Sequence, residues 1–233
     1  TGITQVGASQ YNTYCLKSDG RVNTIGYSKY GTNGNRSSDI RRIPDFVGSS
    51  SVSFGSTPVS DVSSVSAGYH HTLALKNDGT VWGWGRGIES QLGNLINSNT
   101  ATPVIVSDVG GSNYLSGVKS VESGFSFHTL ALKNDGTVYA WGNNSYGALG
   151  DNTLTTRSSP VQVMDAGGSG YLTDVVSVSG GSYSSIAVKS DGTVWTWGQN
   201  DQGQLGNNTK TNSSTPVQVL GVGGSGFLTD VKE

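Results

Sequence analysis

The sequence is poor in cysteine, in charge and in long hydrophobic runs. Its 233 residues include one cysteine, Cys15, which excludes an internal disulfide and a cysteine-based zinc site. Only 13% of the residues are charged and the formal net charge is −2. Proteins that bind nucleic acid by neutralising phosphates usually show a basic excess, so we expect no nucleic-acid partner. Hydrophobic runs such as Val104-Ile105-Val106 are far shorter than the roughly 20 residues of a membrane-spanning helix, so we expect no membrane insertion.

Glycine, by contrast, is abundant, with 35 residues, and its positions repeat. Asp-Gly dipeptides recur at intervals of 59, 57 and 56 residues, and end at Gly20, Gly79, Gly136 and Gly192. Two further glycines and a proline follow each dipeptide at similar offsets. Several markers with one period predict a single domain, 1–233, of repeated units. The expected units are 3–61, 62–117, 118–174 and 175–230, with 231–233 starting a fifth.

Each unit predicts about four short antiparallel strands. Leu73–Lys76 and Thr80–Gly85 flank an Asn-Asp-Gly turn and alternate with a period of two, which indicates a β-hairpin. A further strand fits around Val62–Val65, before the hairpin, and another follows the proline, at Pro103–Val106. No segment shows the sustained 3.6-residue periodicity of a helix. We therefore predict an all-β fold.

One such sheet cannot bury both of its faces alone, whereas sheets stacked radially can. The units therefore predict a β-propeller of about four blades with four antiparallel strands each. In units 2 to 4 an aromatic pair lies on one strand, and its second member is expected to pack between adjacent sheets. These members are Trp84, Trp141 and Trp197. Because 231–233 restart the first strand, we favour an arc of a longer ring over a complete four-bladed ring.

Three segments carry a family resemblance: Gly68–Gly85, Phe127–Thr153 and Ser185–Thr209. They share His-Thr-Leu-Ala-Leu or a variant of it, Asp-Gly, Val-aromatic-x-Trp-Gly and, in the two longer segments, Gly-x-Leu-Gly. The repeat resembles that of the regulator-of-chromosome-condensation family. The resemblance implies a seven-bladed ring, of which this chain would be an arc. The Gly-Gly-Ser-x-(Tyr/Phe)-Leu segments are more similar to a microbial and phage-borne branch, whose members use the ring to bind proteins.

The chain has no clear catalytic constellation. His71 and His128 occupy the same repeat position, at which the other units have Asn12 and Ser184. A catalytic histidine needs one set of partner residues rather than a position that recurs in each repeat, so this recurrence favours a structural role. We expect these side chains to bond to the backbone at a turn. Cys15 aligns with small strand residues, so we expect it to be buried. We therefore predict no catalytic residue, no metal site, no cofactor and no enzymatic activity. A lyase or glycosidase would need paired carboxylates outside the Asp-Gly turns, and we rank it last.

Departures from the repeat indicate two candidate binding surfaces. Unit 1 concentrates basic and aromatic residues, which are favoured interface anchors: Tyr27, Lys29, Tyr30, Arg36, Arg41 and Arg42. This patch either faces a protein or an anion, or it reflects a neighbouring domain or a degenerate unit. The loops after each Trp-Gly form the second surface, with Arg86, Glu89, Tyr146, Asn200 and Asp201. The alternative is that the Asn and Gln side chains of these loops only satisfy turn backbone groups.

The leading hypothesis is a non-enzymatic binding or structural module. Low charge and abundant Gly, Ser, Thr and Asn suit an extracellular, adhesin-like or virion-surface protein, although a cytosolic location stays open. The expected partner is another protein or a cell-surface component, and assembly within a larger particle is a further option. The alternative implied by the resemblance is a guanine-nucleotide exchange factor-like regulator of a small GTPase. That activity would need a protruding wedge, and no insertion in this sequence is long enough to form one.

Overall fold

In the residues that it describes, the computed structural model contains sixteen strands in four sheets. The structure describes residues 2–35, 40–46, 59–125 and 127–232, and for residues 40–46 it describes the backbone alone. Two short 3-10 turns, η1 (Lys29–Gly31) and η2 (Val222–Gly224), are the helical segments of this part. None of the helices found there has the length and apolar character needed to cross a membrane. The expected all-β fold is confirmed.

Each sheet is a four-stranded meander in which consecutive strands pair antiparallel, and we call the sheets blades 1 to 4. Blade 1 contains β1 (Ile3–Ala8), β2 (Asn12–Lys17), β3 (Val22–Tyr27) and β4 (Ile40–Phe46). Blade 2 contains β5 (Val62–Ala67), β6 (His71–Lys76), β7 (Val81–Gly85) and β8 (Thr100–Ile105). Blade 3 contains β9 (Val118–Ser123), β10 (His128–Lys133), β11 (Val138–Gly142) and β12 (Arg157–Gln162). Blade 4 contains β13 (Val175–Gly180), β14 (Ser184–Lys189), β15 (Val194–Gly198) and β16 (Ser213–Gln218).

The fourth strands differ from the sequence prediction at their first residue. In blades 2 to 4 they begin three residues before the proline rather than at it, so that Pro103 lies inside β8. Each fourth strand is the last strand of its sheet, and its pairing with the third strand is irregular beside the proline. A proline is tolerated there because its missing N–H falls on an edge strand.

The Asp-Gly hairpins form as the sequence predicts. Gly79 adopts a positive φ of 77°, and its N–H donates to the Lys76 carbonyl at 2.9 Å. The Asp78 carboxylate closes the turn by accepting from the Thr80 backbone N–H at 2.9 Å and from its hydroxyl at 2.6 Å. The other three predicted turn glycines also have positive φ: Gly20, Gly136 and Gly192. Turn chemistry therefore accounts for these aspartates without a catalytic role.

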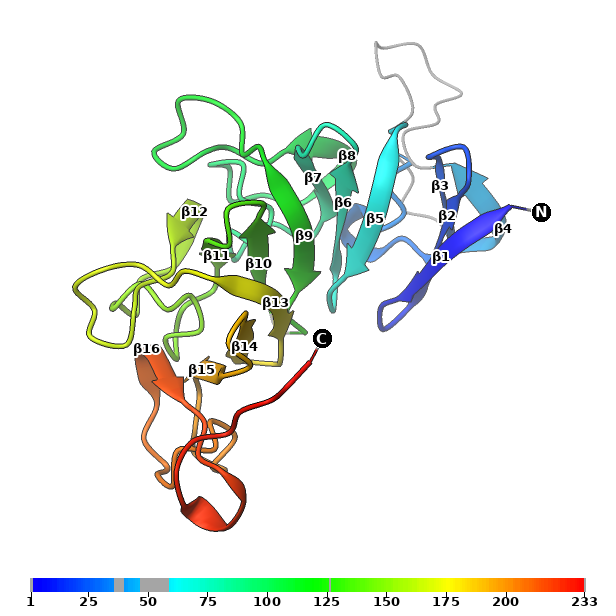
Figure 1. Cartoon of the computed structure of the whole chain (residues 1–233). Coiled ribbons are helices and arrows are strands. Elements are labelled where there is room, and N and C mark those ends of the chain that lie inside the picture. Colours follow the sequence, from blue (N-terminus) through cyan, green and yellow to red (C-terminus); the bar gives the residue numbers. More distant parts are fainter. Residues whose placement is uncertain (1, 36–39, 47–58, 126, 233) are drawn as a thin grey trace.

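The blades follow an open arc (Figure 1). The first strands of neighbouring blades contact one another, so that β5 lies between β1 and β9 on the inner side of the arc. Blades 1 and 4 lie at its two ends, and the four blades do not close into a ring. The arrangement agrees with the expected arc, while the seven-bladed ring implied by the resemblance stays a prediction.

Buried tryptophans join each blade to the one before it. The second aromatic of each pair is fully buried, which confirms its predicted place between adjacent sheets. Each indole Nε1 donates a hydrogen bond of 2.8 or 2.9 Å to a backbone carbonyl of the preceding blade. The pairs are Trp84 with Thr32, Trp141 with Gln91, and Trp197 with Ala148.

Blade 1 leaves one side uncovered. In blade 2 the inner-strand residues Val62 and Val65 are buried against the core of blade 1. The equivalent residues of blade 1, Ile3 and Val6, are exposed. Cys15 lies on the neighbouring strand and is half-buried, so the expectation that it is buried is wrong. The reason is that no blade of the described chain precedes blade 1 and covers this side.

Candidate functional site

Loops of two kinds meet on one side of the arc, which we call the loop face. Because each blade is a meander, the loop between its first and second strands and the loop between its third and fourth strands emerge on the same side. The Asp-Gly hairpins between second and third strands emerge on the opposite side. The loop face therefore carries the segments after each Trp-Gly, together with the short turns before each second strand.

A ring-bearing side chain lies immediately before the second strand of every blade. These residues are Tyr11, His70, Phe127 and Tyr183. Each of the last three contacts a side chain from the loop between the third and fourth strands of the preceding blade. The Tyr30 ring lies 5.1 Å from His70, the Arg86 guanidinium 4.9 Å from the Phe127 ring, and the Tyr146 ring 4.9 Å from Tyr183. The sequence analysis did not identify this position, although a ring-bearing residue recurs there directly before His71 and His128.

Three further aromatic residues depart from the repeat. Tyr27, Tyr69 and Phe125 each occupy a position that is not aromatic in any other unit. The Tyr69 ring lies 5.2 Å from Phe125 and 4.2 Å from His70. Tyr11 lies 6.3 Å from Tyr27 and stacks on His70 at 6.0 Å. These contacts connect blades 1, 2 and 3 through one aromatic cluster, defined as Tyr11, Tyr27, Tyr30, Tyr69, His70, Phe125 and Phe127.

Charged groups border the cluster around Tyr30. This residue has a left-handed φ of 64°, and its ring lies 5.1 Å from both the Lys29 ammonium and the Arg86 guanidinium. Arg86 also forms an ion pair with Glu89, with Nε donating to Oε2 at 2.7 Å. Burial, reinforced by the nearby charges of Arg86 and Lys29, lowers the pKa of His70. His70 is therefore neutral at pH 7 and stacks as an uncharged ring.

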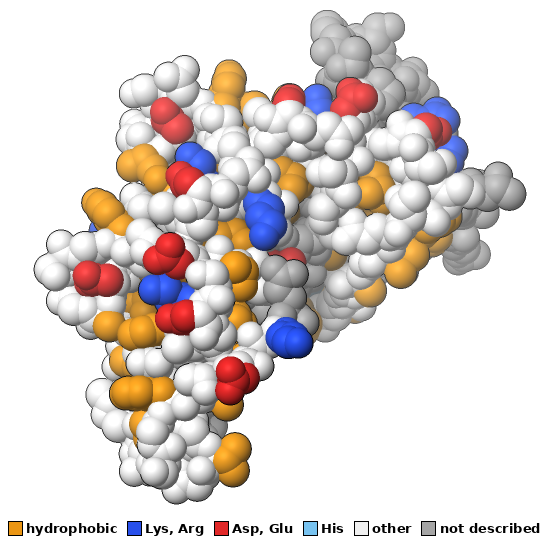
Figure 2. Space-filling view, in the orientation of Figure 1, with side chains coloured by type: hydrophobic (Ala, Val, Ile, Leu, Met, Phe, Trp, Pro, Cys, Tyr) orange, Lys and Arg blue, Asp and Glu red, His pale blue; other side chains and the backbone are white. Residues whose placement is uncertain are grey.

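The structure merges parts of the two surfaces predicted from the sequence. Tyr27, Lys29 and Tyr30 of unit 1 lie beside Arg86 and Glu89 of unit 2, although more than 50 residues separate the two groups in sequence. On the face shown in Figure 2, Lys and Arg side chains are interspersed with Asp and Glu.

Other predicted site residues lie elsewhere. Tyr146 belongs to the junction with blade 4, and Asp201 is exposed on the loop after β15. Arg36 lies outside the described residues. Arg41 and Arg42 lie on β4, whose side chains are also outside the described part of the chain.

Asn200 is not a surface residue, and its prediction as one is wrong. Its side chain is fully buried, and Nδ2 donates to the Asn207 side chain and the Thr209 carbonyl, both at 3.1 Å. Its Oδ1 accepts from the Leu205 N–H at 2.9 Å. The residue organises its own loop, which is the alternative function considered for the polar residues of these loops.

The recurring histidines are structural, but not in the expected way. His71 and His128 are fully buried. Neither ring nitrogen of His71 has a hydrogen-bond partner among the described residues, and His128 Nε2 lies 3.1 Å from the Ser185 hydroxyl. Burial lowers the pKa of His71 to about 3. Within the described part of the chain, no three His, Cys, Asp or Glu residues are grouped to hold a metal ion.

Comparison with known families agrees with this architecture. The model of the regulator of chromosome condensation (RCC1) repeat matches residues 78–132, 135–188 and 191–232, which together are more than half of the chain. The chain belongs to the RCC1-repeat family. A second model of the same repeat matches 62–91, 118–148 and 175–204, each of which includes the first three strands of one blade. The family resemblance of the sequence motifs is thus confirmed.

Curated relatives of this RCC1-repeat chain are much longer proteins. Protein pim1 of Schizosaccharomyces pombe is 31% identical over 225 residues, covering 88% of this chain and 38% of pim1. The human E3 ubiquitin-protein ligase HERC2 is 30% identical over 218 residues, covering 94% of this chain and 4% of HERC2. The chain therefore spans well under two thirds of these relatives. Both are eukaryotic, and neither supports the expected microbial and phage-borne branch.

Solved structures share the fold of this RCC1-repeat arc. Human WBSCR16 superposes with a TM-score of 0.76 at 23% identity, over 95% of this chain and 54% of that one. Yeast RCC1 (Prp20), solved with Kap60 bound, gives a TM-score of 0.75 at 19% identity, over 94% of this chain and 49% of that one. Four blades thus correspond to about half of these propellers.

Proposed function

We propose that this chain is a non-enzymatic protein-recognition part of an RCC1-repeat propeller, and that the aromatic cluster of the loop face contacts the partner. One observation carries the proposal: Tyr27, Tyr69 and Phe125 depart from the repeat and yet converge on one site. Aromatic and Arg side chains dominate the binding energy of protein interfaces, and this site combines both.

The scaffold does not require these three aromatics. Blade 4 folds with Gln199 and Gly181 at the positions of Tyr27 and Phe125. Tyr27 and Phe125 are exposed, so their rings stabilise the blades little in the free chain. Burying them against a partner would remove apolar surface from water at about 25 cal/mol per Å². A role in binding therefore explains these residues better than a role in folding.

Partners named for similar propellers are the first to test. Yeast RCC1 (Prp20) was solved with Kap60, and Prp20p has been studied for binding to Gsp1p and histones. We carry a protein partner over to this chain, and guanine-nucleotide exchange remains the alternative that a nucleotide-release assay on a small GTPase tests. The extracellular or virion location expected from composition is a separate proposal, which the relatives do not support and which fractionation of the producing cells tests.

Site-specific photo-crosslinking tests the proposed face. We would place a benzophenone amino acid at Tyr69 or Phe125, and at Tyr171 as the control, since Phe125 and Tyr171 are 54% and 56% exposed. We expect partner crosslinks at positions 69 and 125 but not at 171. With the purified partner, the triple variant Y27A/Y69A/F125A should bind at least about tenfold more weakly. Unchanged affinity in that variant would overturn the proposal.

A further inference from the structure

Blade 2 departs from the repeat at a second place, the loop between β7 and β8. Leu95 and Ile96 stand there, where blade 3 has Asn152 and Thr153 and blade 4 has Asn208 and Thr209. Leu95 and Asn152 share the same backbone geometry, with φ of 68° and 59° and an N–H that donates to a strand of the next blade. Asn tolerates this left-handed conformation, whereas a branched apolar residue is strained in it.

In the other blades, polar residues at these two positions form hydrogen bonds within their loop. In blade 3 the Thr153 hydroxyl donates to Asp151 at 2.7 Å, and the Thr153 carbonyl accepts from Asn144 at 3.0 Å. Ile96 cannot form the side-chain bond, and it is exposed. Blade 2 thus holds an exposed apolar pair, one member of it strained, where the fold accepts a polar pair. Strain that the fold does not need is a reason to look for a function.

The apolar pair lies in a larger apolar patch on the outer rim of blade 2. Leu95, Ile96, Val109 and Tyr114 are exposed by 50%, 59%, 55% and 60%. Leu95 packs over Gly111, where a Cβ would lie 2.6 Å from its Cδ1. A cavity of about 470 Å³ opens between Leu95, Ile96 and Tyr114, with Val104 and Ile105 of the last strand also lining it. We call this cavity the rim groove.

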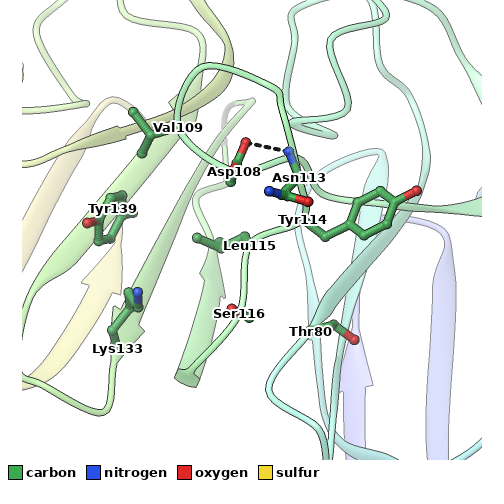
Figure 3. A pocket seen from close by; sticks show the side chains of 9 residues that line it. All are labelled: Thr80, Asp108, Val109, Asn113, Tyr114, Leu115, Ser116, Lys133 and Tyr139. Carbon is green, nitrogen blue, oxygen red and sulfur yellow. Dashed lines mark hydrogen bonds between the residues drawn. The ribbon is translucent and has the colours of Figure 1, made fainter.

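A second cavity, of about 620 Å³, shares Asn113 and Tyr114 with the rim groove and extends toward blade 3. In Figure 3 Lys133 and Tyr139 lie on one side of the connection that carries Leu115, and Thr80 lies on the other. The Lys133 ammonium is 5.5 Å from the Tyr139 ring and has no ion pair within the described part of the chain. The Asp108 carboxylate is occupied by the Asn113 N–H at 2.9 Å. This bond leaves the negative charge of Asp108 in place, so a ligand carboxylate is attracted where it lies beside the Lys133 ammonium and repelled near Asp108.

We propose that the rim groove binds an extended peptide segment of a partner protein. The segment places one bulky apolar side chain between Leu95, Ile96 and Tyr114, and a carboxylate a few residues away beside Lys133. Apolar contact with a preformed cavity supplies the affinity, and the ammonium of Lys133 sets the preference for an acidic neighbour. The rim groove shares no residue with the aromatic cluster, so this proposal can be tested independently of the proposed function.

Peptide selection tests the rim groove directly. A phage library of random twelve-residue peptides would be selected on the whole chain after removal of phage that bind the L95N/I96T variant. We expect a consensus with one large aliphatic or aromatic residue and an Asp or Glu within about four positions. The probe for all further measurements is the synthetic, fluorescein-labelled consensus peptide, followed by fluorescence anisotropy.

The L95N/I96T variant recreates the Asn-Thr pair of blades 3 and 4, so we expect it to fold with an unchanged or higher melting temperature. It should bind the peptide at least tenfold more weakly, and K133Q should weaken binding several-fold and reduce its salt dependence. Y171A on the rim of blade 3 and Y27A/Y69A/F125A on the loop face should bind as the unaltered chain does. Selection of no peptide that depends on Leu95 and Ile96, or of a consensus without an acidic residue, would overturn the proposal.

Discussion

The indole of Trp141 in blade 3 reaches across the blade junction to the carbonyl of Gln91 in blade 2, with Nε1 and oxygen 2.9 Å apart. The same carbonyl accepts from the Thr129 hydroxyl at 3.2 Å, so two strands of blade 3 bind one loop of blade 2. The ring itself is fully buried and packs with core residues of both blades, among them Leu73 and Val121. The junction thus combines apolar packing with two hydrogen bonds that fix the position of blade 3 relative to the Gln91 loop of blade 2.

Trp141→Phe should destabilise the chain by about 2 kcal/mol, since the smaller ring leaves a cavity and removes the bond to Gln91. Urea unfolding followed by circular dichroism measures the change. Trp195→Phe is the matched control, because Trp195 is half-buried and, among the described residues, its indole donates to Thr193 of its own hairpin. An equal effect of the two substitutions would contradict the role given to the junction.

Gly142→Ala should be far more destabilising than Gly203→Ala. Both glycines have positive φ, 101° and 80°. A Cβ on Gly142 would lie 2.3 Å from the Phe127 carbonyl oxygen, whereas nothing lies within 4 Å of one on Gly203. We expect a loss of about 1 kcal/mol for Gly203→Ala and about 3 kcal/mol or more for Gly142→Ala. Thermal unfolding of the two variants separates strain in φ from steric overlap.

Acid should destabilise the chain through His71. Burial lowers its pKa from 6.5 to about 3 in the folded state. Between these values the unfolded chain binds a proton that the folded chain does not, so the free energy of unfolding falls as the pH falls below 6.5. The slope is about 1.4 kcal/mol per pH unit, which gives about 2 kcal/mol between pH 6.5 and pH 5.

His71→Asn isolates this effect, because Asn12 occupies the same slot in blade 1 and bonds the Tyr27 carbonyl at 2.9 Å. The variant should lose about 2 kcal/mol less than the unaltered chain when the pH is lowered from 7 to 5. Urea unfolding at the two pH values measures the difference. Identical pH dependence in the two proteins would show that His71 is protonated in the folded state.

Leu95→Asn should stabilise the chain by about 1 kcal/mol, because Asn tolerates the left-handed conformation that strains Leu. Leu154→Asn is the control, since Leu154 is exposed on the equivalent loop of blade 3 with a negative φ. That change should stay within about 0.5 kcal/mol. A destabilising Leu95→Asn would mean that packing of Leu95 over Gly111 outweighs the strain.

Local chemistry explains what the sequence could predict. The Asp-Gly turn at Gly79 fixes a hairpin on its own, so the strands around it follow within one or two residues. Trp84 could be placed between blades because a tryptophan followed by glycine recurs at the same position in units 2 to 4. These features depend on residues close in sequence or on the period itself.

Contacts between units could not be predicted in the same way. The stacking of Tyr30 on His70 depends on how one blade is rotated against the next, which no periodicity within a unit encodes. Asn200 was wrongly predicted to be exposed for a related reason. A polar residue in a loop is usually exposed, whereas the amide of Asn200 donates to carbonyls of its own loop. A comparison of the units position by position would have found Tyr69, Phe125 and Leu95 as departures.

The open arc has a consequence for how the chain unfolds. In the part of the chain that the structure describes, the main contacts between blades join immediate neighbours. Stability is therefore approximately a sum over three junctions, and blades 1 and 4 each take part in one. Blade 1 also brings Ile25, not tryptophan, to its uncovered side. Hydrogen exchange should therefore be fastest in blade 1 and slowest in blades 2 and 3. A partner bound to the aromatic cluster would touch blades 1, 2 and 3 together, and so would slow exchange most where the free chain opens first.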